Sequence, residues 1–336
     1  MKNTKIIIAL LIIGLLTNAI YSQDRDKRAQ TGLKFLSVSN DARSTAFGGA
    51  VTSLEINNSS AIFFNPASMA NQTNFATATL GMTQWIADIN YTYASLAFAP
   101  FDGDYGVVGF AYTAVDYGKL DRTIRSGLGY IDLGKFSPSA MSFGLSYAIA
   151  LSEKFSVGGN VKYVYQDLSG GHVVGFNTDG SYQKKSFDID VTAFDFGIIY
   201  KTGFKSLNIG MNIRNFSEEL TYIEESFQLP LTFKIGASIN VMDLIQMGDD
   251  FQKLLVSVDA VHSRDFDEQL NMGFEYTVFD AVSLRLGYIY PTDEQGINAG
   301  IGVQQELAGL RMGVDYAYLD FGIFDQVHQF TLNFAF

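Results

Sequence analysis

The sequence predicts an all-β protein, a transmembrane antiparallel β-barrel of about 14 strands with an N-terminal hatch, or plug, in its lumen. Three observations indicate this fold. Segments of about ten residues alternate apolar side chains with small or polar ones, at the period of two that a strand shows. Such segments recur from residue 73 to the end of the chain. The composition is rich in glycine (32), phenylalanine (28) and tyrosine (18) and poor in proline (5), which suits a set of membrane strands.

The last ten residues show the alternation most clearly. One face carries His328, Phe330, Leu332, Phe334 and Phe336, and the other carries Gln329, Thr331, Asn333 and Ala335. An apolar outer face with a small or polar inner face suits a strand that stands between lipid and a lumen. A soluble all-β protein is the alternative, because composition alone does not separate the two.

Residues 1–22 have the features of a signal peptide. Lys2 and Lys5 give a basic start, and residues 6–16 form an apolar run shorter than the roughly 20 residues of a spanning helix. Cleavage after Ser22 would leave Gln23 first; a membrane anchor is the alternative. The chain has no cysteine, which excludes a lipid attached at cysteine, a disulfide and a cysteine-ligated metal.

Residues 23–72 differ from the rest, since they lack clear alternation and are rich in small and turn-forming residues. Two short helices are expected near residues 42–47 and 66–71, with Asp41 and Asn65 as their caps. An irregular segment ahead of the first strand must pack against something. We therefore expect it in the barrel lumen, as a hatch.

Residues 73–336 form the predicted barrel. The alternating segments lie near 73–82, 90–99, 105–114, 139–149, 155–166, 187–201, 205–214, 229–240, 252–262, 268–278, 281–290, 296–305, 309–318 and 327–336. Each is about as long as a tilted strand that crosses a bilayer. In the sixth segment the apolar phase slips near Ala193 and Phe194, which predicts a bulge.

The connections predict how the barrel sits in its membrane. Those after odd-numbered strands include long ones, at 115–138, 167–186 and 215–228, and those after even-numbered strands are mostly short, with 241–251 as the exception. Long loops outside and short turns in the periplasm form the outer-membrane pattern. We expect a multi-pass protein of the cell outer membrane, with the N- and C-termini and the hatch on the periplasmic side.

Tyrosines support this orientation. Several end the odd-numbered strands, and Tyr91 and Tyr93 begin an even-numbered one. We expect all of them at the outer boundary between water and lipid, where amphipathic rings are favoured.

The strand charges are predicted to face the lumen, because a charge on the lipid face would cost about 2–4 kcal/mol at mid-depth. They are Lys162, Arg214, Lys234, Asp259, Glu275, Arg285, Arg311 and Asp315. Glu275 and Arg285 lie symmetrically about the turn near Asp280, so they should be cross-strand neighbours. We interpret this lumenal charge network as ion pairs that fix the barrel and its hatch; a role in transport is the alternative.

Two motifs mark the hatch. The first contains Phe35, Leu36, Asp41, Ala42, Arg43, Gly48 and Gly49, and the second contains Asn65, Pro66 and Ala67. Together they resemble the start of the PorV/PorQ family of Bacteroidetes outer-membrane proteins, which are similar to the FadL-type long-chain fatty-acid transporter barrels. We expect structural roles here, with Gly48 and Gly49 in a tight turn and Arg43 paired with a lumenal acid, Glu275 or Asp259.

The resemblance implies a subunit of the type IX protein secretion system. Its partners would be the secretion translocon barrel, a sortase-like attachment subunit and secreted cargo proteins, bound through the extracellular loops of a barrel set in the lipid bilayer. The alternative is a FadL-like outer-membrane transporter of hydrophobic small molecules.

Other chemistries find little support. Removal of the signal, with its two lysines, leaves 21 basic and 35 acidic residues, a net charge of −14 that argues against nucleic acid. The three histidines, His172, His262 and His328, have no metal-site or hydrolase spacing. We predict no metal, no cofactor and no enzymatic activity.

Overall fold

Fourteen strands form a closed antiparallel barrel in the computed structural model, which describes residues 31–127, 129–169, 172–245 and 251–336. The strands are β1 (Ala76–Gln84), β2 (Asn90–Phe98), β3 (Val107–Asp116), β6 (Ser139–Ser152), β7 (Phe155–Asp167), β10 (Asp188–Lys201), β11 (Asn208–Phe216), β14 (Thr232–Asn240), β15 (Gln252–Ser263), β16 (Gln269–Val278), β17 (Val282–Tyr290), β18 (Ile297–Leu307), β19 (Leu310–Leu319) and β20 (Val327–Ala335). The predicted all-β class, the antiparallel barrel and its fourteen strand segments are confirmed. The signal-peptide prediction lies outside the described residues.

The barrel closes between its first and last strands. β20 pairs with β1 in an antiparallel register that sets Leu332 opposite Leu80. Apolar side chains point outward along the strands, as Phe143, Phe196 and Phe330 do, and remain exposed in the isolated chain. Polar and small side chains point inward, which is the alternation expected of a strand between lipid and a lumen.

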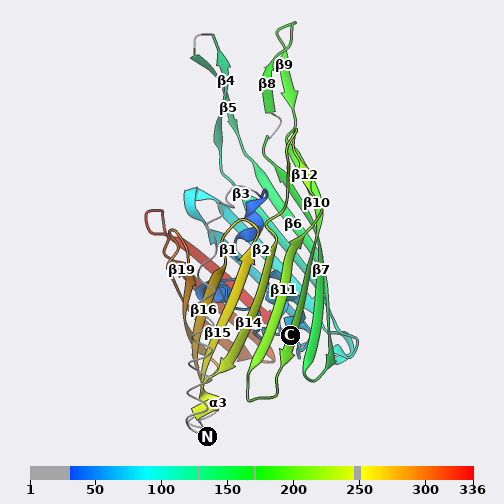
Figure 1. The fold of residues 1–336 in the computed structure, drawn as a ribbon, viewed down its shortest axis with the longest axis vertical. Coiled ribbons are helices and arrows are strands. Elements are labelled where there is room, and N and C mark those ends of the chain that lie inside the picture. Colours follow the sequence, from blue (N-terminus) through cyan, green and yellow to red (C-terminus); the bar gives the residue numbers. More distant parts are fainter. Residues whose placement is uncertain (1–30, 128, 170–171, 246–250) are drawn as a thin grey trace.

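Long and short connections lie at opposite rims (Figure 1). Above one rim rise the hairpins β4 (Leu120–Ser126) with β5 (Gly129–Phe136) and β8 (His172–Phe176) with β9 (Tyr182–Lys185), joined there by β12 (Leu220–Thr221) with β13 (Ser226–Phe227) and by helix η4 (Ile86–Asp88). We call this the long-loop rim. The other, short-turn rim carries η5 (Pro100–Gly103) and α3 (Met242–Ile245). None of the helices within the described ranges is long and apolar enough to cross a bilayer.

The expected bulge belongs to the neighbouring strand. β10 keeps its alternation, with Val191, Ala193 and Asp195 all buried. Its pairing with β11 shifts register between Phe194 and Phe196, where β11 contributes one residue more than β10. The sequence of β10 imitates a change of phase because the inner face of this strand is apolar near the long-loop rim. There it contacts apolar side chains of the N-terminal segment.

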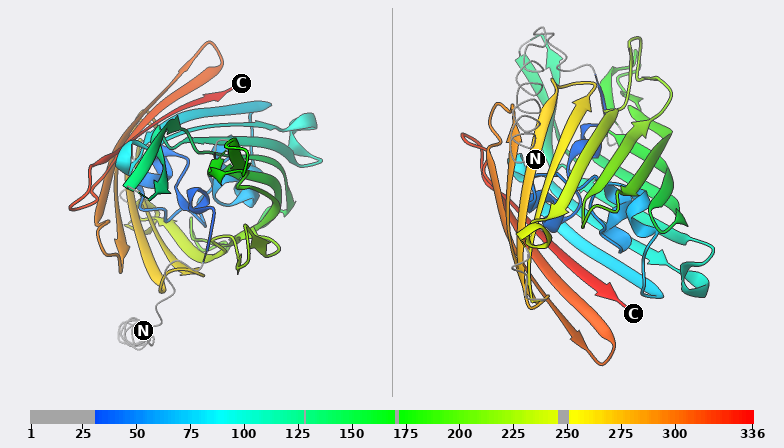
Figure 2. Two further views of the ribbon diagram at one scale, coloured as in Figure 1. Left: turned by 90° about the horizontal axis from the view of Figure 1, so that it is seen from above. Right: turned by 60° about the horizontal axis from the view of Figure 1, so that its bottom comes forward.

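Residues 31–75, which we call the N-terminal segment, lie inside the ring of strands (Figure 2). They contain η1 (Lys34–Ser37), α2 (Ala42–Ala46), η2 (Ser59–Phe63) and η3 (Pro66–Met69). Thr31 forms a parallel bridge with Gln228 at the long-loop rim, whereas Ala76 and Phe336 pair at the short-turn rim. From Thr31 onward the segment therefore starts at the rim opposite the C-terminus and traverses the lumen before the first strand. The expected periplasmic position of the N-terminus concerns residues outside the described ranges.

The buried core lies within the barrel, between the N-terminal segment and the inner faces of the strands. One apolar cluster contains Phe47, Ile62 and Met69 from the segment, and a second, nearer the long-loop rim, contains Leu33 and Phe35. Tyr91 and Tyr93 belong to these clusters and are almost fully buried. Their expected place at the lipid boundary is wrong, because both side chains point inward against the segment.

Candidate functional site

The inner faces of the strands are shaped for the N-terminal segment by glycine. A side chain at several inward-facing glycines would meet the segment closer than 3.0 Å, a distance that real Cβ atoms essentially never show. The pairs are Gly158 with Ala67, Gly197 with Asn65, Gly210 with Thr52, Gly273 with Phe47 and Gly287 with Gly48. Because the backbones approach this closely, the segment and the barrel wall pack as one interior.

Short helices and a tight turn give the segment its local shape. The side chain of Asp41 accepts hydrogen bonds from the backbone N–H and hydroxyl of Ser44, which caps α2. Burial raises the pKa of Asp41 above its usual range. Asn65 caps η3 with Pro66 in the first turn, and its amide donates to the carbonyls of Thr52 and Ile198. The expected caps are confirmed.

Gly48 and Gly49 follow α2 with φ of 67° and 70°. A residue with a Cβ is strained in this left-handed region, so glycine suits the turn. Gly48 also lies against the backbone of Met272 and Tyr288. The expected tight turn is present, and it presses the segment onto strands β16 and β17.

A chain of ion pairs joins α2 to three strands. Arg43 donates through Nε and Nη2 to the carboxylate of Glu275 on β16, at 2.9 and 2.7 Å. Arg285 on β17 donates to the same carboxylate at 2.5 Å and to Asp315 on β19 at 2.6 Å. The negative charge of Glu275 raises the pKa of Arg43. Glu275, Arg285 and Asp315 are buried, so each charge relies on its partners in place of water.

From Asp315 the network of ion pairs continues through uncharged side chains to a second point on the N-terminal segment. Asn333 on β20 donates to Asp315 at 3.0 Å, and Thr79 on β1 donates to Asn333 at 2.8 Å. The hydroxyl of Ser59, at the start of η2, lies 3.0 Å from that of Thr79. The network thus begins and ends on the N-terminal segment and crosses the seam between β20 and β1.

A second cluster lies on the opposite wall. Lys162 on β7 donates to both oxygens of Asp195 on β10 at 2.8 Å and to Asn215 on β11 at 2.6 Å. Asn160 also donates to Asp195, at 2.9 Å. Sequence reasoning missed Asp195, because the false slip in β10 hid the face on which it lies. Its spacing of two from Ala193 and Gly197 on that inner face was the available signal.

The remaining predicted charges divide into two groups. Lys234 donates to the carbonyl of Gly49 at 3.2 Å, and Asp259 accepts from the backbone N–H of Thr52 at 3.0 Å. Arg214 lines a cavity of about 30 Å³ beside Lys162 and Asp195. Lys234 and Asp259 thus contact the N-terminal segment, and Arg214 faces the interior.

Arg311 does not join the lumenal network. It lies next to the first residue of β19, at the short-turn rim, where its side chain is 56% exposed and pairs with Glu306 at 3.3 Å. The alternation assigned the correct face but not the depth. A charge this near a strand end reaches water, so the prediction of a buried lumenal partner is wrong for Arg311.

The long-loop end of the segment has different contacts. Phe35 and Leu36 are buried in the apolar cluster. Lys34 forms an ion pair with Asp265, which also accepts from Thr31 at 3.1 Å. Phe35 and Leu36, the first two residues of the first motif, therefore lie among apolar side chains, whereas Arg43 of the same motif lies in the ion-pair network.

A set of hydrogen bonds lies at the same rim and joins two connections to the end of β7. Tyr222 donates to Gln166 at 3.1 Å, and Gln166 donates to Tyr117 at 3.0 Å. Burial raises the pKa of Tyr222 to about 12, so the phenol stays protonated and able to donate at neutral pH.

No metal centre emerges in the ranges that the structure describes, where no group of three or more His, Asp or Glu side chains is placed to hold an ion. The geometry supplies packing, hydrogen bonds and ion pairs.

A closed fourteen-strand barrel with apolar side chains outward and a charged lumen belongs to the outer-membrane class of β-barrels. The family model described as "Type IX secretion system membrane protein PorP/SprF" matches residues 57–334. The chain therefore belongs to the PorP/SprF family, and the type IX secretion system is the one that the hatch motifs implied. The PorV/PorQ assignment stays an expectation.

Solved structures share the fold at low identity. The toluene transporter TbuX of Ralstonia pickettii has a TM-score of 0.55 and 12% identity, covering 89% of this chain and 98% of that chain. The toluene transporter TodX of Pseudomonas putida has the same score and identity, covering 87% and 96%. A FadL homologue of Pseudomonas aeruginosa has a TM-score of 0.53 and 14% identity, covering 89% and 98%. A search of curated proteins found no match.

Proposed function

We propose that this chain is an outer-membrane subunit of the type IX secretion system that binds secreted cargo, the translocon or the attachment subunit through its extracellular loops. In this role the N-terminal segment is a fixed plug, or hatch, and the long-loop rim faces outward. The barrel serves as a rigid platform, and specificity resides in the loops.

The observation that carries the proposal is the filled bore. Arg43 and Ser59 tie the segment to the strands at two points through one continuous network. A movable gate would have to break buried ion pairs, and removing one partner of such a pair costs about 3–5 kcal/mol. These contacts favour a fixed plug over a gate.

The small size of one cavity in the bore supports the same choice. The cavity beside Lys162 and Asp195 has a volume of about 30 Å³. An engineered apolar cavity that holds benzene has about 150 Å³. Leu33, Phe35 and Leu36 occupy the apolar space near the long-loop rim, where a hydrophobic molecule would otherwise fit.

The test is affinity purification of the tagged chain from its native outer membrane, with quantitative mass spectrometry. One variant replaces residues 119–136, the β4–β5 hairpin, by a short Gly-Ser turn. A matched control replaces the short-turn residues 202–207 in the same way. We expect the hairpin variant to lose secretion-system proteins by about tenfold or more, as when central contacts of an interface are removed, and the control to retain them.

The alternative, a FadL-like transporter of hydrophobic small molecules, has one observation in its favour, the likeness of its fold to the toluene transporters TbuX and TodX. Its test is toluene uptake into proteoliposomes. Uptake by the unaltered protein above that of empty vesicles would support transport. We expect none until Phe35 and Leu36 are replaced by serine. Heat-modified migration on gels would confirm in each case that the barrel is folded.

A further inference from the structure

The connections of the long-loop rim are sorted by charge. Residues 117–138 and 168–187, the β4–β5 and β8–β9 hairpins, carry six basic and three acidic residues; we call them the basic hairpins. The other connections of this rim form what we call the acidic sector, with one basic and twelve acidic residues. They are residues 85–89, 217–231, 264–268, 291–296 and 320–326.

This sorting follows the order of strands around the barrel. The basic hairpins join β3 to β6 and β7 to β10, which are neighbouring pairs, so both rise on one side of the rim (Figure 1). The acidic connections join the strands that follow, from β11 round to β2. The connections therefore give the rim a basic side and an acidic side, and Asp116, Asp167, Asp188 and Asp190 lie below the basic hairpins, at the ends of their strands.

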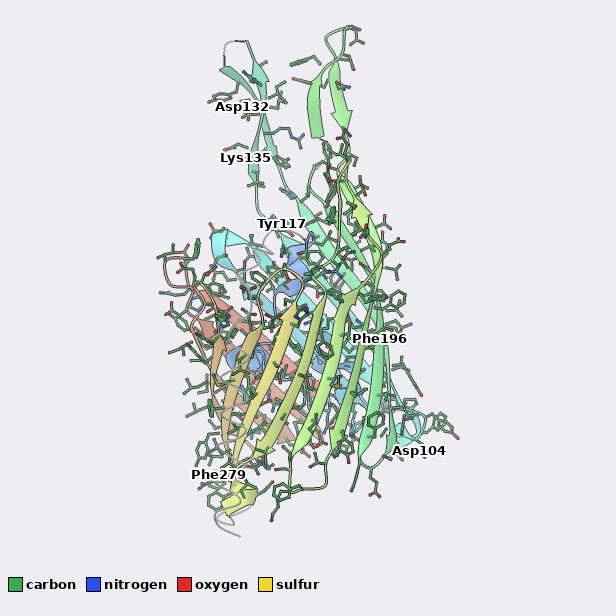
Figure 3. The ribbon with its side chains drawn as sticks, in the orientation of Figure 1. Asp104, Tyr117, Asp132, Lys135, Phe196 and Phe279 are labelled. Carbon is green, nitrogen blue, oxygen red and sulfur yellow. The ribbon has the colours of Figure 1, made fainter. Side chains whose placement is uncertain are left out.

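The charges that matter are accessible and close to the rim. Lys184 and Lys185 end β9, two residues before β10 begins. Lys135 lies below Asp132 on its hairpin (Figure 3). Lys119, Lys135, Lys184 and Lys185 are exposed, as are Glu218, Glu219, Glu224 and Glu225 of the acidic sector. The basic side chains thus lie low enough on their hairpins to reach loops of an adjacent molecule.

The membrane restricts how two copies can meet. A bilayer holds every copy upright at the same depth, so contacts between rims are lateral. The formal net charge of −12 makes copies repel each other in most orientations. Attraction requires the basic side of one copy to face the acidic side of the next, within a screening length of about 8–10 Å.

Aromatic side chains on the hairpins add apolar area to this surface. Tyr130, Phe176 and Tyr182 are exposed, and the rings of Phe176 and Tyr182 lie 5.5 Å apart. Exposed ion pairs alone are weak. Aromatic residues are enriched at protein interfaces, where they supply the contact area that charges lack.

We propose that the basic hairpins of one copy dock against the acidic sector of a second copy of this chain, side by side in the membrane. The contact is heterologous, since different surfaces meet, and it continues into rows or closed rings. The inference is independent of the secretion partners.

The experiment measures energy transfer between copies in phosphatidylcholine vesicles. Because the chain has no cysteine, Lys154→Cys at the short-turn rim gives one site for donor or acceptor dye. One triple variant reverses the net charge of the hairpins (K119E, K184E, K185E). A matched variant reverses the net charge of the 217–231 connection, the part of the acidic sector that carries four glutamates (E218K, E224K, E225K). We expect each alone to reduce transfer about threefold or more, and a mixture of the two variants to restore it. Asp104→Lys, at the short-turn rim, is the charge control and should change nothing.

The unaltered protein provides a second measurement that needs no variant. Transfer should fall by about the same factor when salt is raised to roughly 0.5 M, since the attraction is screened. Transfer no higher than random placement predicts, or transfer insensitive to salt and to both triple variants, overturns the proposal. So does a mixture that fails to restore transfer, or a hairpin variant that keeps full transfer and loses a different protein partner.

Discussion

Residues 31–40 and residues 41–70 share one lumen and both pack through apolar side chains, but only the second stretch joins the buried network of ion pairs. The first stretch is buried by apolar contacts around Leu33 and Phe35, with the ion pair of Lys34 and Asp265 at its exposed end. The second packs in its own apolar cluster around Phe47 and Ile62, and it is held in addition by hydrogen bonds and ion pairs from inward polar groups, with Arg43 at their centre. Apolar packing is non-directional, whereas ion pairs and hydrogen bonds demand one geometry.

The difference indicates which part of the N-terminal segment should open more easily. Removing a partner from the second stretch leaves a buried charge uncompensated, so its cost falls on the whole barrel. The first stretch lies next to the rim, where we expect it to open locally, since segments near the edge of a fold open at lower free energy than the core. Four substitutions test this contrast.

Glu275→Gln should have the largest effect. It leaves Arg43 and Arg285 facing a neutral amide, and we expect the free energy of unfolding to fall by about 3–5 kcal/mol. Urea titration of the barrel in vesicles, followed by tryptophan fluorescence, measures this. Glu306→Gln is the control, since its pair with Arg311 is exposed. Equal losses for the two would remove the distinction between buried and exposed pairs.

Phe35→Ala should come next, and its effect should be local. Loss of a buried ring opens a cavity, and we expect residues 31–38 to lose about 3 kcal/mol of protection. Hydrogen exchange with mass spectrometry resolves this stretch from residues 41–70, whose protection should not change. A uniform loss across both stretches would show that they open as one unit.

Gly287→Ala should cost about 1–3 kcal/mol, since the new methyl group meets the backbone of Gly48 and overpacks the interface. The thermal unfolding midpoint reports it. Gly313→Ala is the matched control on β19, because its Cβ would meet neighbours at ordinary distances of 3.6 to 3.9 Å. A destabilisation as large in the control would point to strand propensity rather than to the close approach.

Lys34→Ala should have the smallest effect. The lysine side chain is 45% exposed, and the buried Asp265 keeps its hydrogen bond from Thr31 when the lysine is removed. We therefore expect a loss of about 1 kcal/mol, which salt should reduce. Exchange of the amides of residues 32–36 at low and high salt measures the contribution. A larger loss that salt does not diminish would mean that Lys34 stabilises the segment mainly through the Phe266 ring, whose centre lies 5.2 Å from the lysine Nζ, rather than through the ion pair.

The barrel was predictable because its signal is periodic and local. Alternation along β6, β16 and β20 assigned each side chain to a face, and turn lengths assigned each strand end to a rim. The caps Asp41 and Asn65 followed from local rules for helix starts. Each of these depends on a few neighbouring residues.

The interior was less predictable because its partners are distant in sequence. The apolar inner residues Val191 and Ala193 imitated a phase slip, since they match Leu33 and Phe35 rather than lipid. Tyr91 was likewise assigned to the boundary between water and lipid, because the sequence does not show that its side chain meets a second apolar surface inside the barrel. Periodicity reports two faces; it does not report depth along the strand or which face meets a second apolar surface.

The seam between β1 and β20 has a consequence for how the molecule is made. Thr77 pairs with Ala335, so the ring stays open until synthesis reaches the final strand. The residues that fill the bore precede β1 and lie close against glycine-lined walls. We therefore expect the barrel to close around a segment that is already in place, with pairing of β1 and β20 as the concluding step.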